Sequence, residues 1–468
     1  MQASGGSRRL RRLRARLERR EGTIGPSQRR DRITALRFWA SVGSVVLLVG
    51  FVVWSLKSRG NDNFGTQKDA FQTWRVRGVA AAMNVAKSKF GYDASNKTWV
   101  NLGRGAPETG NLPGQPSRSL VADKPWLSYP PPSGIYPLRA AIAAYYNDLY
   151  RASKVSKYAP ENVLVCAGGR NAILRVFASL DAKTSVVGME SPDYPAYVDF
   201  VELFRLKSVI LNRRRTSNAD VIIRSNPGNP TARVLRTGSL KQMLQEAKDT
   251  GTTIVLDEFY SHYVYSEDES NSVSGAKAVE DVNKDNVLLI NGLTKNFRMP
   301  GVRIGWIVGP EHLIAEISKR AMFLDGGANH YFQHVAVPLL EPSFAKRDMA
   351  ALQRHFRKKR DFVVARLNAI GIRTGEPPEG TFYIFADVSG LPPPLNDSEQ
   401  LFLKLLERGV IVVPGIYFSL ESSTSAKRGS MLRSAEWLRR RVRFSFGPRL
   451  EDLARGLDIL STLVSELN

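Results

Sequence analysis

Several side chains able to do chemistry each follow a short apolar run in this sequence. Asn229 comes after DVIIRS, Asp257 and Tyr260 come after TIVL, Lys295 comes after NVLLI, and Arg303 lies eight residues beyond the lysine. Taken singly, each has an ordinary explanation, such as a helix cap or a solvated charge. A lysine amine can also act as a nucleophile or, with a lowered pKa, as a general base. Their shared position after apolar runs indicates one common site.

The elements that must position these groups alternate along residues 138–320. Short apolar runs at 185–188, 220–225, 253–257 and 286–290 read as strands, and helix-like stretches separate some of them. This alternation predicts an α/β domain with parallel strands and crossover helices. Ligands of open parallel sheets bind beyond the carboxyl ends of the strands, which is where the reactive side chains fall.

A second, smaller unit is predicted after this domain. Residues 345–370 have the pattern of one long amphipathic helix, and TFYIFADV, GVIVVPG and VRFSFG then read as strands. Upstream, residues 71–90 are helix-like and residues 101–137 are rich in Gly and Pro. The chain has no evident internal repeat, so we expect a large domain followed by a smaller α+β domain.

The net charge of +23 is unevenly distributed. Residues 1–60 hold 13 Arg and 1 Lys against 3 acidic residues, so nearly half of the excess lies in a short tail. The remainder is only mildly basic, and we predict no nucleic-acid partner. The single cysteine, Cys166, excludes an internal disulfide framework. His330 and His334 share a helical face, but no third ligand is near in sequence, so we predict no metal site.

Residues 38–56 form an uncharged run of membrane-spanning length, flanked by Arg37 and Lys57. As a helix the run extends roughly 28 Å, close to the thickness of a hydrocarbon core. Trp39 and Trp54 lie near its ends, where indoles favour the membrane interface. A buried core helix is the alternative, but such a helix would not be uncharged on every face. We therefore predict one transmembrane anchor.

The segment before this run, RRLRRLRARLERR at 8–20, places leucines on one helical face among arginines. It suits an anionic membrane surface or an organelle-targeting presequence, and a solvated disordered arm is equally compatible. Twelve Arg precede the span, whereas few basic residues follow it closely. The positive-inside rule then predicts a single-pass protein with a cytoplasmic N-terminus and the large domain across the membrane.

At this point the sequence resembles the class I/II aminotransferases, which are fold type I enzymes dependent on pyridoxal phosphate. The resemblance rests on the order NPGNPT, LDEFY, LTKNF, GVRIGW and VRFSF, and covers roughly residues 99–465. It implies a large domain with a mostly parallel central sheet and helices on both faces, plus the smaller α+β domain. The expected division is a basic tail (1–37), a transmembrane helix (38–56), a linker with an N-terminal arm and part of the small domain (57–137), the large domain (138–322) and the small C-terminal domain (323–468).

The resemblance also implies roles around the cofactor ring. Lys295 would carry pyridoxal phosphate as a Schiff base and act as general base when substrate frees it. Asp257 would pair with the pyridine nitrogen and sustain the ring as an electron sink. Asn229 and Tyr260 would hydrogen-bond the phenolic oxygen, and Arg303 would hold the phosphate.

Further positions match the family less distinctively. Gly169 and Arg170 fall at a helix start whose N–H groups could cradle the phosphate, and Thr294 could add a hydroxyl. Tyr194 matches an aromatic residue that stacks on the cofactor ring, and we place it with Lys295 and Asp257 among the catalytic residues. Tyr129 matches a tyrosine that reaches the phosphate of the neighbouring subunit, which implies a homodimer.

Substrate contacts are implied by the same comparison. Arg443 matches the residue that binds the substrate α-carboxylate, with Arg441 as the alternative on the same strand face. Gly105 lies where backbone approaches that carboxylate, and Asn229 is expected there as well. Arg320 could be proposed for a second carboxylate, but its spacing matches poorly.

Some positions depart from the family pattern. Gly292 stands where many relatives place a phosphate-binding Ser, and Ala232 stands where NPGNPT is usually followed by Gly. An additional stretch at about 420–440 precedes the last strand. These departures leave open the substrate preference and how strongly the phosphate is bound.

The function predicted from all these features is ping-pong transfer of an amino group between an L-amino acid and a 2-oxo acid. Another reaction on the same cofactor is the alternative: a lyase, decarboxylase, oxidase or acyl-transferring synthase. Synthases of that last kind typically carry His where this chain has Tyr260. A membrane scaffold without activity is the non-enzymatic alternative, and the intact set of reactive residues argues against it.

Overall fold

The computed structural model describes residues 77–467 except for gaps at 94–95, 106, 109–111, 117–128, 212–218, 266–271 and 421–427. The predicted basic tail (1–37) and transmembrane helix (38–56) lie outside the described residues. Within the described ranges, no helix is both long and apolar enough to cross a membrane.

A seven-stranded sheet forms the centre of the large domain, in the order β2-β8-β7-β6-β5-β3-β4. All neighbouring pairs are parallel except those made by β8, which runs antiparallel to β2 and β7. The mostly parallel sheet predicted from the sequence is confirmed. Its strands are β2 (Val163–Cys166), β3 (Val186–Met189), β4 (Lys207–Ile210), β5 (Val221–Ser225), β6 (Thr253–Asp257), β7 (Val287–Gly292) and β8 (Gly305–Val308).

Helices cover both faces of this sheet because alternate strand residues are apolar on each side. Val255 and Leu288 face a core that contains residues of α5, α6 and α8, whereas Ile254 and Val287 face a core with residues of α4 and α7. The bounds of these helices are α4 (Tyr136–Tyr150), α5 (Gly169–Phe177), α6 (Ala196–Leu203), α7 (Thr237–Thr250) and α8 (Glu311–Leu324).

The smaller domain is built on an antiparallel sheet of order β11-β12-β9 and a parallel pair, β1 with β10. The strands that the sequence predicted after residue 380 are present in the structure as β9 to β12. The elements are α3 (Gly78–Phe90), β1 (Val100–Asn101), β9 (Tyr383–Asp387), α11 (Ser398–Leu406), β10 (Val410–Ile411), β11 (Val413–Pro414), α12 (Arg428–Arg439), β12 (Arg441–Ser445) and α13 (Leu450–Ser465).

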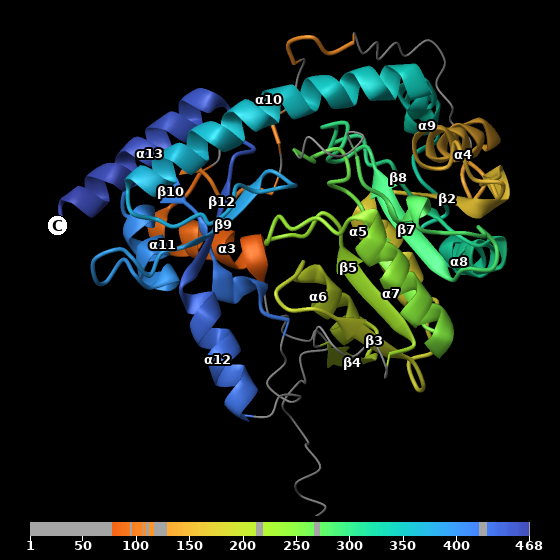
Figure 1. Cartoon of the computed structure of the whole chain (residues 1–468), viewed down its shortest axis with the longest axis horizontal. Coiled ribbons are helices and arrows are strands. Elements are labelled where there is room, and N and C mark those ends of the chain that lie inside the picture. Colours follow the sequence, from red (N-terminus) through yellow and green to blue (C-terminus); the bar gives the residue numbers. More distant parts are fainter. Residues whose placement is uncertain are drawn as a thin grey trace, which may run out of the picture. The chain divides into compact units, whose positions relative to one another are not determined.

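The long helix α10 (Pro342–Ala369) joins the two domains (Figure 1). Its first turns bury Ala345 in the core that contains α4, and its later turns bury Phe356 and Val363 with the strands of the small domain. The expected domain border at residues 322–323 falls inside α8. The remaining elements are α9 (His330–Ala336) and the 3-10 turns η1 (Pro160–Asn162), η2 (Gly275–Lys277), η3 (Val337–Leu340) and η4 (Gly415–Phe418).

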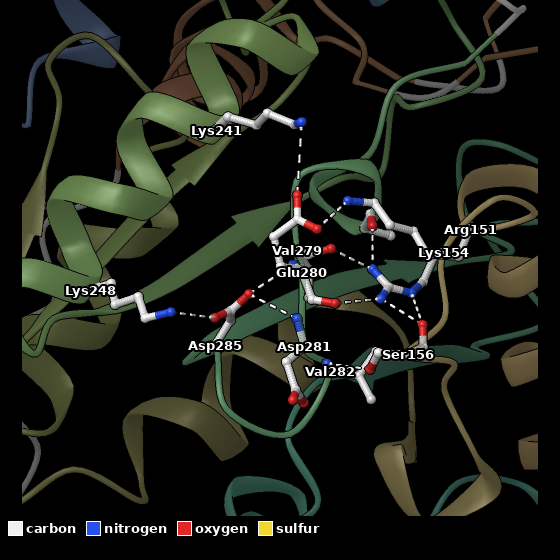
Figure 2. Close-up of polar contacts among 11 residues, drawn as sticks. Arg151, Lys154, Ser156, Lys241, Lys248, Val279, Glu280, Asp281, Val282 and Asp285 are labelled. Atoms are coloured by element: carbon white, nitrogen blue, oxygen red, sulfur yellow. Dashed lines mark hydrogen bonds and ion pairs between the residues drawn. The ribbon is translucent and has the colours of Figure 1, made fainter.

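A buried arginine fixes the end of α4 to the loop that precedes β7. The guanidinium of Arg151, which is 0% exposed, donates to the carbonyl oxygens of Ser156, Ala276, Val279 and Glu280 at 2.6 to 3.2 Å (Figure 2). Around it, Lys154 pairs with the Glu280 carboxylate at 2.6 Å. The positive charge thus satisfies carbonyl groups that no secondary structure pairs.

Arg151→Met is expected to lower the free energy of unfolding by about 3 kcal/mol, because several buried carbonyls lose a charged donor. Lys154→Met is the matched control in the same network. Its partner is exposed, so its loss is expected to cost under about 1 kcal/mol. Thermal and denaturant unfolding of both variants measure the difference. Equal, small effects would show that the Arg151 contacts contribute little to stability.

Candidate active site

A cavity of about 650 Å³ opens where β5, β6 and β7 end, and residues of the small domain complete its wall. The structure brings almost all predicted site residues to this one cavity. Those that line it are Gly105, Gly169, Arg170, Tyr194, Asn229, Asp257, Tyr260, Thr294, Lys295, Arg303 and Arg443. Tyr129 does not line it: its side chain is 92% exposed.

Asp257 closes the end of β6 and is buried. Its Oδ2 accepts a hydrogen bond from the Tyr197 hydroxyl at 3.0 Å, and its Oδ1 accepts from the Phe259 N–H at 3.3 Å. Burial raises the pKa of Asp257 to about 6, although both hydrogen bonds and the Lys295 charge act in the opposite sense. A cation beside this carboxylate would therefore be strongly favoured.

Lys295 follows β7, and its Nζ donates to the carbonyl oxygen of Gly105. Burial and the nearby charges of Arg443, Arg170 and Arg104 lower the pKa of Lys295 to about 7. An ordinary lysine titrates near 10.4, so this amine is far more nucleophilic at neutral pH than a surface lysine.

The lowered pKa predicts how the amine reacts in cofactor-free protein. Because protonated Lys295 is unreactive, its acetylation by acetic anhydride is expected to rise between about pH 6 and 8 and then level off. Peptide mass spectrometry after short labelling at each pH measures this. A labelling curve that keeps climbing to pH 10 would mean that the lysine titrates normally.

Arg443 reaches the cavity from β12 and is 1% exposed. It donates to Asn229 Oδ1 at 2.8 Å and to the carbonyl oxygen of Gly103 at 2.9 Å, while its Nε is buried without a partner. A buried guanidinium with spare donors suits a carboxylate. The alternative, Arg441, pairs instead with the Asp387 carboxylate at 3.5 Å.

A short relay of hydrogen bonds, which the sequence did not suggest, holds Asn229 in place. The Ser225 hydroxyl donates to Asp193 Oδ1 at 2.5 Å and accepts from the Asn229 N–H at 2.9 Å. Burial raises the pKa of Asp193 to about 7, against the hydrogen bonds from Ser225 and the N–H of Tyr194. Asp193 thus links the Tyr194 loop to the loop that carries Asn229.

The part of the cavity beside Gly168 and Arg303 suits an anion. Gly168 caps the nine-residue helix α5 with φ 85°, and a methyl group there would collide with the Arg303 guanidinium. A methyl group at Gly169 would collide with the Phe259 ring. Arg303 is exposed, has φ 58° and donates to the Ala167 carbonyl at 3.1 Å. A helix N-terminus beside a guanidinium is a favourable phosphate site.

Two further predicted residues line the same cavity. The Thr294 hydroxyl is buried without a hydrogen-bond partner, so it has a donor to offer to a ligand. Arg170 donates through Nε to the Tyr194 hydroxyl at 2.9 Å, which holds that ring at the cavity wall. Tyr194 in turn contacts Tyr197 edge to face, with the ring centroids 5.5 Å apart.

The residues fit pyridoxal phosphate on these structural grounds. A lysine of lowered pKa suits the aldehyde, the Asp257 carboxylate suits a pyridinium nitrogen, and the Gly168–Arg303 end with the unpartnered Thr294 hydroxyl suits a phosphate. Among the described residues no cluster of His, Cys, Asp or Glu could hold a metal ion.

Tyr383 is a cavity residue that sequence reasoning missed. Its hydroxyl shares a 2.8 Å hydrogen bond with that of Tyr260, and the Arg443 guanidinium lies 4.0 Å from its ring centroid. TFYIFADV reads only as a strand, but β9 pairs with β12 so that Phe385 opposes Arg443. Tyr383 lies two residues before Phe385 on β9, so its side chain is on the same face of the sheet as that of Arg443. Knowing this strand register would have allowed Tyr383 to be predicted as a site residue.

Two of the three departures from the family pattern, Gly292 and Ala232, have structural correlates. A methyl group at Gly292 would lie 2.6 Å from the Gly305 Cα, because β7 and β8 approach closely there. Ala232 is buried with φ 58°, a left-handed conformation in which glycine has no steric cost.

This fold and this site define a fold type I enzyme that uses pyridoxal phosphate. The family model "Aminotransferase class I and II" matches residues 97–439, and the chain belongs to this family. It is therefore a pyridoxal-phosphate-dependent aminotransferase.

Individual relatives agree with this assignment. An aspartate aminotransferase from Pyrococcus horikoshii is 28% identical over 339 residues, which is 68% of this chain and 83% of that protein. One from Streptomyces avermitilis is 26% identical over 80% of this chain and 91% of its own length. The N-succinyldiaminopimelate aminotransferase structure from Mycobacterium tuberculosis has a TM-score of 0.68 at 24% identity, covering 84% of this chain and all of that chain, and supports the fold.

Proposed function

We propose that this enzyme transfers the amino group of an L-amino acid to a 2-oxo acid in ping-pong order, with Lys295 as the residue that binds the cofactor covalently. The observation that carries this proposal is the convergence of Lys295, Asp257 and Arg443 on one cavity. Pyridoxal phosphate supplies an aldehyde that bonds to amines and a ring that accepts electrons from the substrate Cα.

The roles of the protein's own groups follow from their positions. Arg443 binds the α-carboxylate and Asn229, which accepts from Arg443, keeps that guanidinium oriented. Lys295 Nζ removes the Cα proton, since a pKa of about 7 suits a general base at neutral pH. Asp257 keeps a proton on the ring nitrogen, and Thr294, Arg303 and the Gly169 N–H bind the phosphate.

The relatives indicate which donors to try first. Two of the three relatives described above, those from Pyrococcus horikoshii and Streptomyces avermitilis, are named aspartate aminotransferases, so aspartate with a 2-oxo acid is the first pair to test. Tyr260 stands where acyl-transferring synthases typically carry His, and this favours amino transfer over that reaction.

An absorption spectrum and a donor screen test the proposal. Protein purified with pyridoxal phosphate is expected to be yellow, and borohydride should fix the cofactor on the Lys295 peptide. Adding an amino donor alone should remove the colour and release the oxo acid, because the first half-reaction needs no acceptor. Release of carbon dioxide or of a side-chain fragment instead would contradict amino transfer.

We also propose a homodimer in which Tyr129 reaches the partner's phosphate site. Tyr129 is 92% exposed and Phe323, at the end of α8, is 87% exposed. The two segments are neighbours, since a Cβ on Gly327 would lie 3.3 Å from Pro130. Exposed apolar side chains in adjacent segments favour a protein interface.

Mixed dimers of Lys295→Ala and Tyr129→Phe chains provide the test. If Tyr129 serves the neighbouring subunit, each mixed dimer has one site with both residues intact, and activity reappears on mixing. If Tyr129 acted within its own subunit, every site would lack one residue and mixing would restore nothing.

A membrane anchor at residues 38–56 remains our proposal for the N-terminal part. Its support is the uncharged length of the run and its flanking tryptophans. Full-length protein is expected to stay with membranes in high salt, because apolar burial is not screened by ions. Release by salt would show that only the basic tail holds the protein to lipid. Protease access from either side of sealed vesicles tests the cytoplasmic placement of the N-terminus.

A further inference from the structure

Two carbonyl groups that contact reactive side chains belong to the segment that follows β1. The carbonyl oxygen of Gly103 accepts from the Arg443 guanidinium at 2.9 Å, and that of Gly105 accepts from Lys295 Nζ. The strand β1 ends at Asn101, so strand pairing does not hold either glycine. The contacts that fix this segment therefore also orient Arg443.

Glu108 joins this segment to helix α10 and to the end of β12. Its carboxylate accepts from Lys359 Nζ at 2.8 Å and from His355 Nε2 at 2.5 Å, two side chains of α10. Partial burial acts to raise the pKa of Glu108, but the hydrogen bonds from His355 and Lys359 lower it to about 2. The Glu108 N–H and Lys359 Nζ both donate to the Gly447 carbonyl oxygen, at 2.9 and 3.2 Å. Gly447 follows β12, the strand that carries Arg443.

Arg298 joins the same segment to the turn that carries Lys295. Its N–H donates to the carbonyl oxygen of Lys295 at 2.9 Å. Its guanidinium donates to the carbonyl oxygen of Glu108 at 3.3 Å and to Gln115 Oε1 at 2.5 Å. Gln115 in turn donates to Asp348 of α10 at 2.5 Å. Arg298 is 2% exposed, so its buried charge depends on such partners.

Together Glu108, Lys359 and Arg298 form a cluster outside the cavity, which we call the Glu108 cluster. None of the three side chains lines the cavity, so they do not touch a ligand bound there. Through its hydrogen bonds the cluster connects the turn of Lys295, which follows β7, to the end of β12, which carries Arg443. It therefore links the two groups that must act on one substrate molecule.

We propose that the residues of the Glu108 cluster are positioning residues, which hold Arg443 at the place relative to Lys295 that the substrate requires. They act through the Gly103 carbonyl and through Gly447. The α-carboxylate must bind at Arg443 while the substrate Cα lies within reach of Lys295, and a displacement of about 1 Å can cost roughly 100-fold in rate. This inference rests on the proposed function, which assigns the α-carboxylate to Arg443.

Two oxyamines measure the contribution of Arg443 in the enzyme loaded with cofactor, without amino transfer. Aminooxyacetate and methoxyamine both displace Lys295 from the cofactor, which changes the absorbance, and only aminooxyacetate has a carboxylate for Arg443. The ratio of their second-order rates therefore reports how well Arg443 is aligned with the reacting carbon. In Lys359→Met this ratio is expected to fall about tenfold, because Glu108 and Gly447 lose their shared donor.

Lys358→Met is the matched control, because Lys358 is the exposed neighbour of Lys359 on α10, and its ratio should stay native. Glu108→Gln keeps the size of the side chain and serves as the second variant if Lys359→Met does not fold. Its ratio should fall about threefold, because only the charge of the acceptor is lost. Thermal unfolding shows which variants are folded at the assay temperature. A native ratio in the variant that folds overturns the inference, even if its stability is lower.

Arg443→Lys shows whether the cluster acts through Arg443. Combined with Lys359→Met, it should lower the ratio no further than it does alone, because both changes act on the same guanidinium. Additive losses would overturn the inference. If Arg443→Lys itself left the ratio native, the α-carboxylate assignment of the proposed function would fail, and the inference with it. A lowered ratio in Arg443→Lys beside a native ratio in Lys359→Met contradicts the inference alone.

Discussion

Lys295→Ala is expected to abolish covalent attachment of pyridoxal phosphate and to lower turnover by about four orders of magnitude or more. In the proposed mechanism, the variant loses both the nucleophile that holds the cofactor and the base that moves the Cα proton. The other contacts proposed for the cofactor remain, at the Gly168–Arg303 end of the cavity and at Asp257, so we expect the cofactor still to bind without a covalent bond. The loss should therefore fall on kcat more than on cofactor affinity.

The measurements are the borohydride-stable mass added to the protein and the rate of oxo-acid formation. Lys319→Ala is the control, because Lys319 lies on α8 and, among the described residues, forms an ion pair only with Glu316 on the surface. That variant should keep both the colour and the rate. A Lys295→Ala enzyme with near-normal turnover would remove Lys295 from the mechanism.

The sequence predicted those parts of the site that depend on strand ends. Asn229, Asp257 and Lys295 follow β5, β6 and β7, and neighbouring parallel strands bring their carboxyl ends together whatever the details of packing. The antiparallel strand β8 was not foreseen, because GWIV is apolar throughout and carries no directional signal.

The parts that sequence reasoning missed depend on contacts between distant segments. Tyr383 meets Tyr260 only because β9 of the small domain lies beside the turn that follows β6, although 123 residues separate the two tyrosines in the sequence. Ser225 and Asp193 read as an ordinary strand end and turn, yet their hydrogen bond positions Asn229. Such roles arise from tertiary packing, which local patterns do not encode.

Asp257→Asn is expected to retain the cofactor but to lower kcat by about three orders of magnitude. The Asn amide has the size of the carboxylate but no negative charge, so it cannot hold a proton on the pyridine nitrogen. The electrons released at the substrate Cα then lose their main acceptor, and the penalty falls on the transition state rather than on binding. Tyr197 would still have an oxygen at position 257 to donate to, so the local packing should persist.

The neighbouring residue provides a strict control for this variant. Glu258 is also a buried carboxyl, but its oxygens accept from the Ser274 hydroxyl at 2.7 Å and the Gly275 N–H at 2.6 Å, away from the cavity lining. Burial raises the pKa of Glu258 to about 8, so this group is mostly uncharged at pH 7, and Glu258→Gln changes little charge there. Its kcat should stay within severalfold of the native enzyme. If single-turnover rates fell equally in both variants, the loss would reflect a damaged strand end. If Asp257→Asn kept its rate, Asp257 would be a structural carboxylate with no part in the chemistry.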